Sequence, residues 1–244
     1  LRLRFERKRK MFTKWPMPFD ESNQEIMRLK VILFSWMGTV DGRIWDRRGD
    51  VIRVKQAKVH LNYFLALERD MEAVSRYIEF AEDNLDTYSI ELAHLLFAAS
   101  SEVDVIAKAI CRTIAPDAPA ANINQYRAVL VAAIPDFPEM EVFIPRYGLT
   151  FKPWEAWGVG DNPNWWRSYN KVKHERDAYF NEATLQNALN ALGGLLVMTF
   201  HFYRLTLPGL IQEPFPAKQV MLALQPESGL YRLHESHYYE GVIV

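Results

Sequence analysis

Apolar residues recur every three or four positions through two long stretches of the chain, which is the spacing of one face of an α-helix. The clearer stretch covers residues 88–113 and ends just before a proline. Residues 54–83 show the same period and predict two helices or one bent helix, separated from the first stretch by turn and capping residues at 84–87. A shorter helix is expected at 118–133.

A third long helix is predicted at 162–207, with Asp161 or Asn162 as its N-cap and Pro163 in its first position. A straight helix of that length, about 67 Å at 1.5 Å per residue, would outgrow a domain of this size. We therefore expect a kink at the glycine pair 193–194.

The prolines between residues 135 and 153 break the helical pattern and leave room for a β-hairpin at about 140–152. Its strands are expected at 141–144 and 149–152, and its turn at Tyr147 and Gly148.

Together these elements predict a mainly α-helical fold, an up-down helical bundle with a small β-hairpin insertion. Residues 55–207 are expected to form this helical domain, with a poorly defined N-terminal extension at 1–54 and a C-terminal extension at 208–244 that packs on the domain. Within the C-terminal extension, residues 230–233 and 238–244 can pair as short edge strands. The length of 244 residues and the hydrophobic content of 49% suffice for one globular core.

Charge and composition narrow the classes of partner. The formal net charge of −1 gives the whole molecule no field that attracts nucleic acid, so an RNA contact would need a local basic patch. Six Lys and Arg residues crowd positions 1–10, a pattern more typical of a solvated tail than of a nucleic-acid arm. A single cysteine, Cys111, suits a reducing cytoplasm. The longest apolar stretch, about 191–203, is shorter than the about 20 residues that a bilayer requires, so no membrane span and a cytoplasmic location are expected.

Three polar side chains stand where the apolar seam of the third long helix should run. At about 100° per residue, Arg167 and His174 lie within roughly 20° of each other, and Asn170 lies about 60° to one side. Continued along the helix, their face meets the apolar stripe that contains Leu185 and Leu192. We therefore expect the three side chains to point inward or into a cleft, where a charged group is costly unless it is paired or used.

Residues 165–176 (WWRSYNKVKHER), together with the helix at 88–108, resemble the HEPN superfamily of bacterial and archaeal helical proteins. That superfamily is defined by an arginine followed four to six residues later by a histidine on a late helix, and Arg167 and His174 match with six residues between them. The resemblance covers about residues 60–207. It implies a metal-independent endoribonuclease built across a homodimer, in toxin-antitoxin or phage-defence systems, with RNA as substrate and an antitoxin or other protein as partner.

The residue types fit such a reaction. RNA cleavage without a metal needs proton transfer at the 2′-OH and the 5′-oxygen, and a cation that stabilises the charge on the phosphate oxygens. His174 would be the acid or base, and the guanidinium of Arg167 would hold phosphate oxygens. Asn170 would fix the imidazole or bind a phosphate oxygen, while Lys171 and Lys173 would add positive potential. No metal and no cofactor is expected. A spacing of about 10 Å between the Cα atoms of Arg167 and His174 favours a composite site with a second chain.

Two alternatives remain open. Arg167 and His174 could pair with Glu102 or Asp104 of the 88–113 helix and form a buried polar network that holds two helices in register. The residues alone favour that network over catalysis. The HEPN superfamily also contains members without nuclease activity, so a catalytically inactive helical module that binds a partner protein or nucleic acid is the other alternative.

Other candidate sites are weaker. A cluster of tryptophans could stack on RNA bases, but aromatic clusters beside a helix start more often belong to the core. The cluster consists of Trp154, Trp157, Trp165 and Trp166. His234 and His237 are three residues apart and would need a third ligand to bind a metal. The sequence has no phosphate-binding glycine loop, paired-cysteine zinc spacing or nucleophile elbow, which argues against kinases, P-loop enzymes and standard hydrolases.

Overall fold

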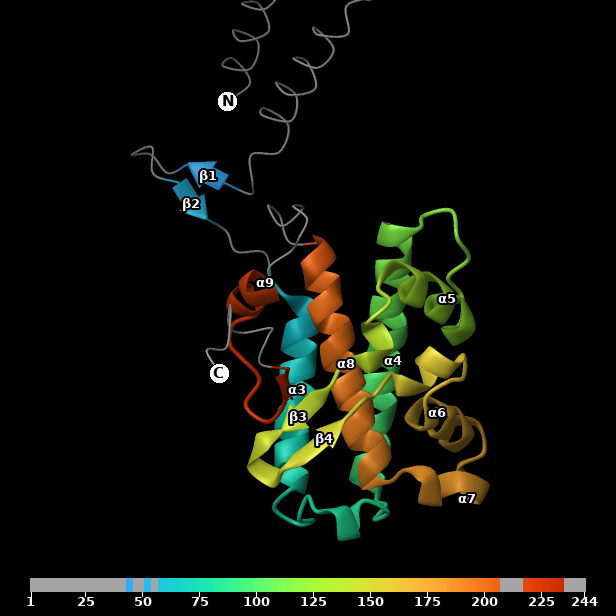
Figure 1. Ribbon diagram of the computed structural model, residues 1–244. Coiled ribbons are helices and arrows are strands. Elements are labelled where there is room, and N and C mark those ends of the chain that lie inside the picture. Colours follow the sequence, from blue (N-terminus) through green and yellow to red (C-terminus); the bar gives the residue numbers. More distant parts are fainter. Residues whose placement is uncertain (1–42, 46–50, 54–56, 207–216, 235–244) are drawn as a thin grey trace, which may run out of the picture. The chain divides into compact units, whose positions relative to one another are not determined.

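The structure of the chain is a computed structural model (Figure 1). It describes residues 43–45, 51–53, 57–206 and 217–234. The basic segment at 1–10, His237 and the expected strand at 238–244 lie outside these residues.

The chain divides between Ala57 and Lys58 into two units. In the first unit, strands β1 (Arg43–Trp45) and β2 (Val51–Arg53) pair antiparallel, with Ile44 opposite Ile52. The second unit contains all the helices that the structure describes, and it is the subject of the remaining description.

The second unit is mainly helical, as the apolar periodicity predicts. Its helices among the described residues are α3 (Val59–Val74), α4 (Ile90–Ile114), α5 (Ile123–Ala133), α6 (Asn164–His174), α7 (Arg176–Tyr179), α8 (Leu185–Thr206) and α9 (Ala217–Ala223).

Helix α4 lies where its strong amphipathic pattern places it. Its N-cap is Ser89, whose hydroxyl accepts the N–H of Leu92 at 3.2 Å and satisfies one of the free donors of the first turn. Helix α5 begins later than expected, after Asn122, whose side-chain oxygen accepts the N–H groups of Asn124 and Gln125. Helix α3 stops at Val74, well before the predicted end.

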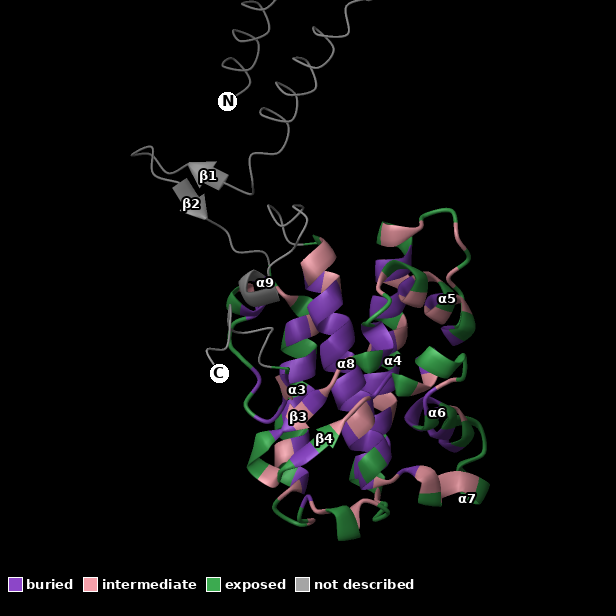
Figure 2. Ribbon diagram, in the orientation of Figure 1, coloured by how far each residue is buried: buried purple, intermediate pink, exposed green. Residues whose placement is uncertain are grey.

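Helix α8 forms the centre of the core, and its middle part is buried on every side (Figure 2). In Figure 1, α3 and α4 lie on either side of α8, and α6 packs beyond α4. This arrangement leaves α6 with one face against the bundle and the opposite face in solvent.

Helices α4 and α8 begin side by side and run in the same direction (Figure 1). The backbone N–H of Leu185 donates to the carbonyl of Thr87 at 2.8 Å, and that of Gln186 donates to Leu85 at 2.9 Å. Neighbouring helices of an up-down bundle are antiparallel, so the predicted up-down arrangement does not describe this pair.

The predicted β-hairpin is present, with β3 (Val142–Ile144) paired to β4 (Leu149–Phe151). Gly148 closes the turn in the left-handed conformation at φ 66°, which favours glycine. Strand β5 (Arg232–Leu233) pairs with the other edge of β3, giving the order β4-β3-β5. The sheet packs closely on α8 at Gly193, where an added Cβ would lie 3.4 Å from Cγ1 of Val142 in β3 and 3.2 Å from the Cγ of Pro153, which follows β4.

The predicted single helix at 162–207 is wrong. Helix α6 ends at His174, the short helix α7 and a 3-10 turn at Phe180–Glu182 follow, and α8 then begins at Leu185. The break lies in this connection, whereas α8 continues through the glycine pair 193–194, where the expected kink would fall. There the indole N–H of Trp154 donates to the carbonyl of Gly194 at 3.2 Å.

A buried carboxylate attaches the C-terminal segment to α3. Glu68 is 4% exposed and accepts the backbone N–H groups of Gly229, Leu230 and Tyr231 at 3.1, 2.9 and 3.2 Å, as well as the hydroxyl of Ser228. These donors satisfy the carboxylate inside the core. Residues 217–234 therefore pack on the helical unit.

The single cysteine and the apolar helices complete the description of the fold. Cys111 is buried, and burial raises the pKa of its thiol to about 11, so the thiol stays protonated and unreactive at neutral pH. Of the helices that the structure describes, none combines the length and apolar character that crossing a bilayer requires.

Candidate functional site

Helix α6 carries the five residues that the sequence singles out, but in a different orientation from the predicted one. Its buried face consists of Trp165, Trp166, Ser168, Tyr169 and Val172. The exposed basic side chains of the helix are together called here the α6 face. Arg167, Lys171 and His174 lie opposite the buried face, and Lys173 lies at its edge, over the ring of Tyr169.

Arg167, Asn170 and His174 were predicted to point inward or into a cleft. The inward direction is wrong for Arg167 and His174, which are exposed, while Asn170 is half-buried. The prediction treated α6 and α8 as one continuous helix, so the face that carries Arg167 and His174 was expected to continue into the apolar face of α8. Because the chain leaves the helix between the two, the faces of α6 and α8 have no common phase.

The guanidinium of Arg167 is held by a carboxylate from the loop that precedes α6. Its Nη1 donates to Oδ2 of Asp161 at 2.8 Å, and both side chains are about half exposed, at 49% and 59%. The other oxygen of Asp161 accepts the backbone N–H of Asn162 at 2.7 Å. This backbone hydrogen bond and the charge of Arg167 lower the pKa of the Asp161 carboxyl.

The amide of Asn170 is turned toward its own helix. Its Nδ2 donates to the carbonyl of Trp166 at 2.8 Å. The predicted hydrogen bond from this amide to the imidazole of His174 is therefore not formed. His174, the last residue of α6, is exposed, and no hydrogen bond or ion pair joins it to another described residue.

Lys171 and Lys173 belong to the α6 face, and each lies over an aromatic ring. The Nζ of Lys171 is 5.3 Å from the ring centre of Tyr179, and that of Lys173 is 5.2 Å from the ring centre of Tyr169. With His174, they place three basic side chains in the last turn of α6, where the helix dipole favours positive charge.

Glu182 connects α6 to the turn before α8, a contact that the sequence reading missed. Its carboxylate accepts the Nζ of Lys171 at 2.6 Å and the buried hydroxyl of Ser168 at 2.7 Å. Burial acts to raise the pKa of Glu182, but these two hydrogen bonds and the charge of Lys171 outweigh it, so the pKa lies below its usual value.

The predicted network between α6 and α4 does not form through Glu102 or Asp104. Glu102 pairs with Nδ1 of His60 at 2.5 Å. Asp104 accepts the phenol hydroxyl of Tyr126 at 2.8 Å and also pairs with Lys108. Neither carboxylate bonds to α6, which contacts α4 through aromatic rings instead.

The aromatic contact between these helices also holds a cation. The rings of Phe97 on α4 and Tyr169 on α6 meet edge to face with their centres 5.9 Å apart. The guanidinium carbon of Arg176 lies 5.2 Å from the ring centre of Phe97. Arg176 thus extends the exposed basic side chains of the α6 face onto α7.

The tryptophan cluster belongs to the core, as aromatic clusters at a helix start usually do. Trp154, Trp157, Trp165 and Trp166 are all buried. The indole N–H of Trp165 donates to the carbonyl of Pro153 at 2.8 Å. With their rings packed inside, these residues offer no platform for RNA bases.

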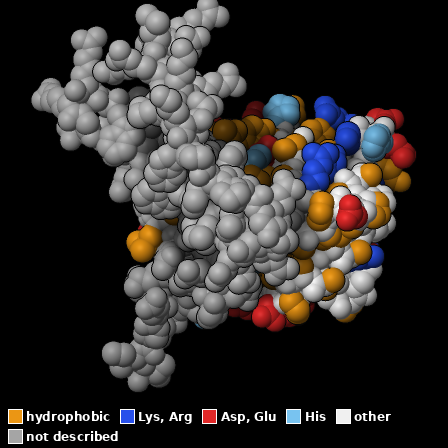
Figure 3. All heavy atoms as spheres, turned by 90° about the horizontal axis from the view of Figure 1, so that it is seen from above, with side chains coloured by type: hydrophobic (Ala, Val, Ile, Leu, Met, Phe, Trp, Pro, Cys, Tyr) orange, Lys and Arg blue, Asp and Glu red, His pale blue; other side chains and the backbone are white. Residues whose placement is uncertain are grey.

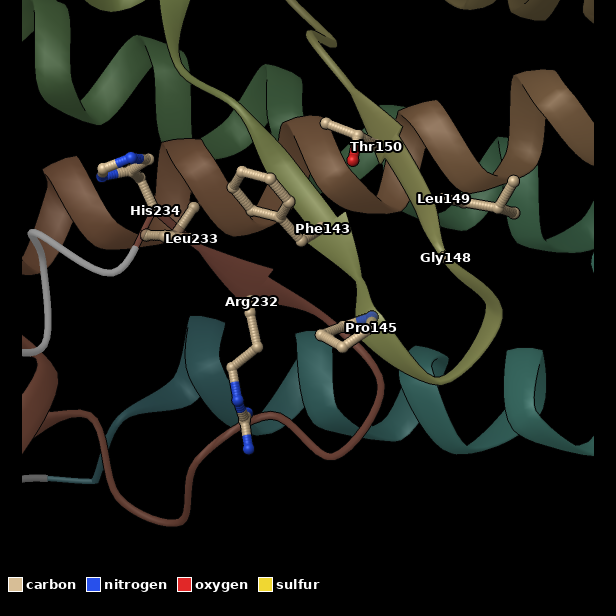
Figure 4. Close-up of a pocket in the computed structure, with 8 residues that line it drawn as sticks. All are labelled: Phe143, Pro145, Gly148, Leu149, Thr150, Arg232, Leu233 and His234. Carbon is tan, nitrogen blue, oxygen red and sulfur yellow. The ribbon is translucent and has the colours of Figure 1, made fainter.

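A shallow hollow of about 410 Å³ lies on the three-stranded sheet (Figure 4). Its lining is mostly apolar, and its polar side chains are Thr150, Arg232 and His234. The guanidinium of Arg232 is engaged by the backbone carbonyls of Ser228 and Tyr231. The described residues contain no group of three or more His, Cys, Asp or Glu side chains that could hold a metal ion.

Comparisons with known proteins assign no family. No protein-family model matches the chain, and neither a curated protein nor a solved structure gives a significant match. The resemblance of residues 165–176 to the HEPN superfamily therefore remains a prediction from the sequence.

Proposed function

We propose that the chain is an RNA-binding helical module that contacts single-stranded RNA through the α6 face and Arg176. The observation that carries this proposal is the set of exposed cations placed beside aromatic rings at the end of α6 and the start of α7. Basic side chains bind the phosphates of single-stranded RNA, and an aromatic ring beside them can stack on a base. Of the rings at this place, Tyr179 is half-buried and is the one that a base would meet, whereas Tyr169 is buried.

The charge balance around the α6 face indicates whether RNA would be bound by a broad positive field or by particular contacts. Residues 161–182 contain four Lys and Arg residues and four Asp and Glu residues. On the end of the molecule shown in Figure 3, the described residues likewise expose basic, acidic and hydrophobic side chains, not one sign of charge. RNA binding would therefore depend on particular contacts at the α6 face more than on a broad positive field.

Replacing Lys173 and Arg176 together by alanine is expected to weaken RNA binding about tenfold and to lower the slope of log affinity against log salt by about 0.7 per lost phosphate contact. Fluorescence anisotropy of a labelled oligouridine at several salt concentrations measures both quantities. Arg69→Ala, which removes an exposed cation of α3, is the matched control and should leave affinity nearly unchanged. Equal losses in the control and in the double variant would contradict the proposal.

A second candidate function is metal-independent RNA cleavage, which one observation favours. His174 is exposed, joined to no other described residue, and on the same helix face as Arg167, about two turns away. An exposed imidazole can reach a bound RNA and act on it as a general acid or base. A second copy of the chain would have to supply the remaining groups, because Asn170 is engaged by its own helix.

Cleavage is tested by incubating single-stranded RNA with the protein in EDTA. If this second function holds, the native chain cuts the RNA, and His174→Ala and Arg167→Ala each lower the rate at least about a hundredfold. Both positions are exposed, so unfolding free energies within about 0.5 kcal/mol of the native value should accompany the loss. Intact RNA in every reaction would leave binding as the function and exclude cleavage.

A further inference from the structure

Arg167 already holds an anion that belongs to the chain itself. Oδ2 of Asp161 lies 2.8 Å from Nη1 of Arg167. A phosphate group uses the same guanidinium N–H donors, which match two anionic oxygens. A phosphate that binds the N–H that Asp161 now accepts must therefore displace Asp161.

The pair is suited to such an exchange. Both side chains are about half exposed, and exposed ion pairs contribute little to stability because water screens them. The backbone N–H of Asn162 holds the other carboxylate oxygen of Asp161 at 2.7 Å, so the loop keeps this anion beside α6. Displacing it requires no unfolding of the helix, because Asp161 lies outside α6.

The same arrangement occurs one turn further along the α6 face. Lys171 pairs with Glu182 at 2.6 Å. Glu182 is less exposed than Asp161, at 24%, and also binds the buried hydroxyl of Ser168, so it fastens the chain after α6 as well as neutralising a cation. Asp161 is the position where the competing charge can be removed without loss of a buried contact.

We propose that Asp161 is an internal competitor of RNA that occupies Arg167 in the free protein and gives way when a phosphate binds. This inference rests on the proposed function, RNA binding at the α6 face. Asp161 thereby sets the affinity of the site, and the exposed cation is neutralised as long as no RNA is bound.

The test compares Asp161→Asn with Asp177→Asn by fluorescence anisotropy of a labelled single-stranded oligouridine. Asparagine at 161 keeps an oxygen for the N–H of Asn162 while it removes the charge. Asp177 is exposed on α7, so its substitution changes the net charge equally without touching Arg167. We expect Asp161→Asn to bind RNA about two- to fivefold more tightly than the native chain and Asp177→Asn to bind nearly as the native chain does.

Arg167→Ala, alone and combined with Asp161→Asn, separates the competitor role of Asp161 from RNA binding at the α6 face. The proposal predicts that Arg167→Ala weakens binding and that adding Asp161→Asn then has no further effect. A different result would overturn the role of Asp161 as a competitor while RNA binding at the α6 face stands. In that result Arg167→Ala weakens binding, but Asp161→Asn alone does not strengthen it, or strengthens it only as much as Asp177→Asn does. If Arg167→Ala leaves RNA binding unchanged, both the competitor and the placement of RNA on Arg167 are overturned.

Discussion

Glu68→Ala is expected to lower the free energy of unfolding by about 3–5 kcal/mol. The carboxylate of Glu68 is buried and accepts three backbone N–H groups of residues 229–231 and the hydroxyl of Ser228. Alanine leaves these donors without acceptors inside the core, and each buried unpaired donor costs about 1–3 kcal/mol unless water reaches it. Urea unfolding followed by circular dichroism measures the change.

Two further substitutions show whether the carboxylate itself is responsible. Glu68→Gln keeps one acceptor oxygen and should lose less stability than Glu68→Ala. Asp70→Ala removes an exposed acid from the same helix and should change the free energy of unfolding by no more than about 0.5 kcal/mol. A loss in Glu68→Ala no larger than that in Asp70→Ala would show that Glu68 does not hold the C-terminal segment.

Trp154→Ala is expected to destabilise the chain by about 3–5 kcal/mol, the usual loss for a large aromatic side chain in a core. Trp154 is fully buried, its ring centre lies 4.3 Å from that of Trp157, and its N–H bonds to Gly194 of the central helix. The substitution opens a cavity where the sheet side of the fold meets α8. Thermal and urea unfolding both measure the loss.

The control for Trp154 is Val159→Ala, which shortens an apolar side chain that is 86% exposed and should have little effect. Trp154→Phe should fall between the two, because the ring is kept but the hydrogen bond to Gly194 is lost. Native stability in Trp154→Ala would mean that this tryptophan is not part of the core and would reopen its role as a surface for stacking bases.

Strong local patterns allowed part of the fold to be predicted from the sequence. Helix α4 has apolar residues at helical spacing along its whole length, so its position was predicted to within about two residues, the usual uncertainty of a helix end. Its N-cap is Ser89, whereas the capping residues were expected at 84–87. The hairpin was predicted because prolines exclude a helix and Gly148 suits a left-handed turn. In both cases, the residues of the element itself determine its conformation.

The break between α6 and α8 could not be predicted in this way, because residues 175–184 contain neither proline nor glycine. Contacts with distant residues fix it. The ring of Tyr88 meets that of Phe180 edge to face at 5.7 Å, and Glu182 bonds to Ser168 and Lys171. Because this break was not predicted, the expected direction of Arg167 and His174 was wrong. The sequence therefore singled out candidate residues on one helix but not their exposure.

The sequence also contains a sign of the structural role of Glu68. Glu68 stands at a position where helical spacing from Phe64, Leu65 and Met71 requires an apolar side chain. A lone acid on the buried face of a helix is costly unless several donors meet it. The same reasoning that singled out Arg167 and His174 thus applies better to Glu68, whose partners are backbone groups far along the chain.

Photo-crosslinking most directly tests the claim that RNA lies on the α6 face. The native protein would be irradiated with single-stranded RNA that contains 4-thiouridine, and the crosslinked peptides would be identified by mass spectrometry. RNA on this face predicts crosslinks within residues 164–180, including Tyr179 beside Lys171, and their loss in Lys173→Ala/Arg176→Ala. Crosslinks confined to other parts of the chain, or unchanged in that variant, would contradict it.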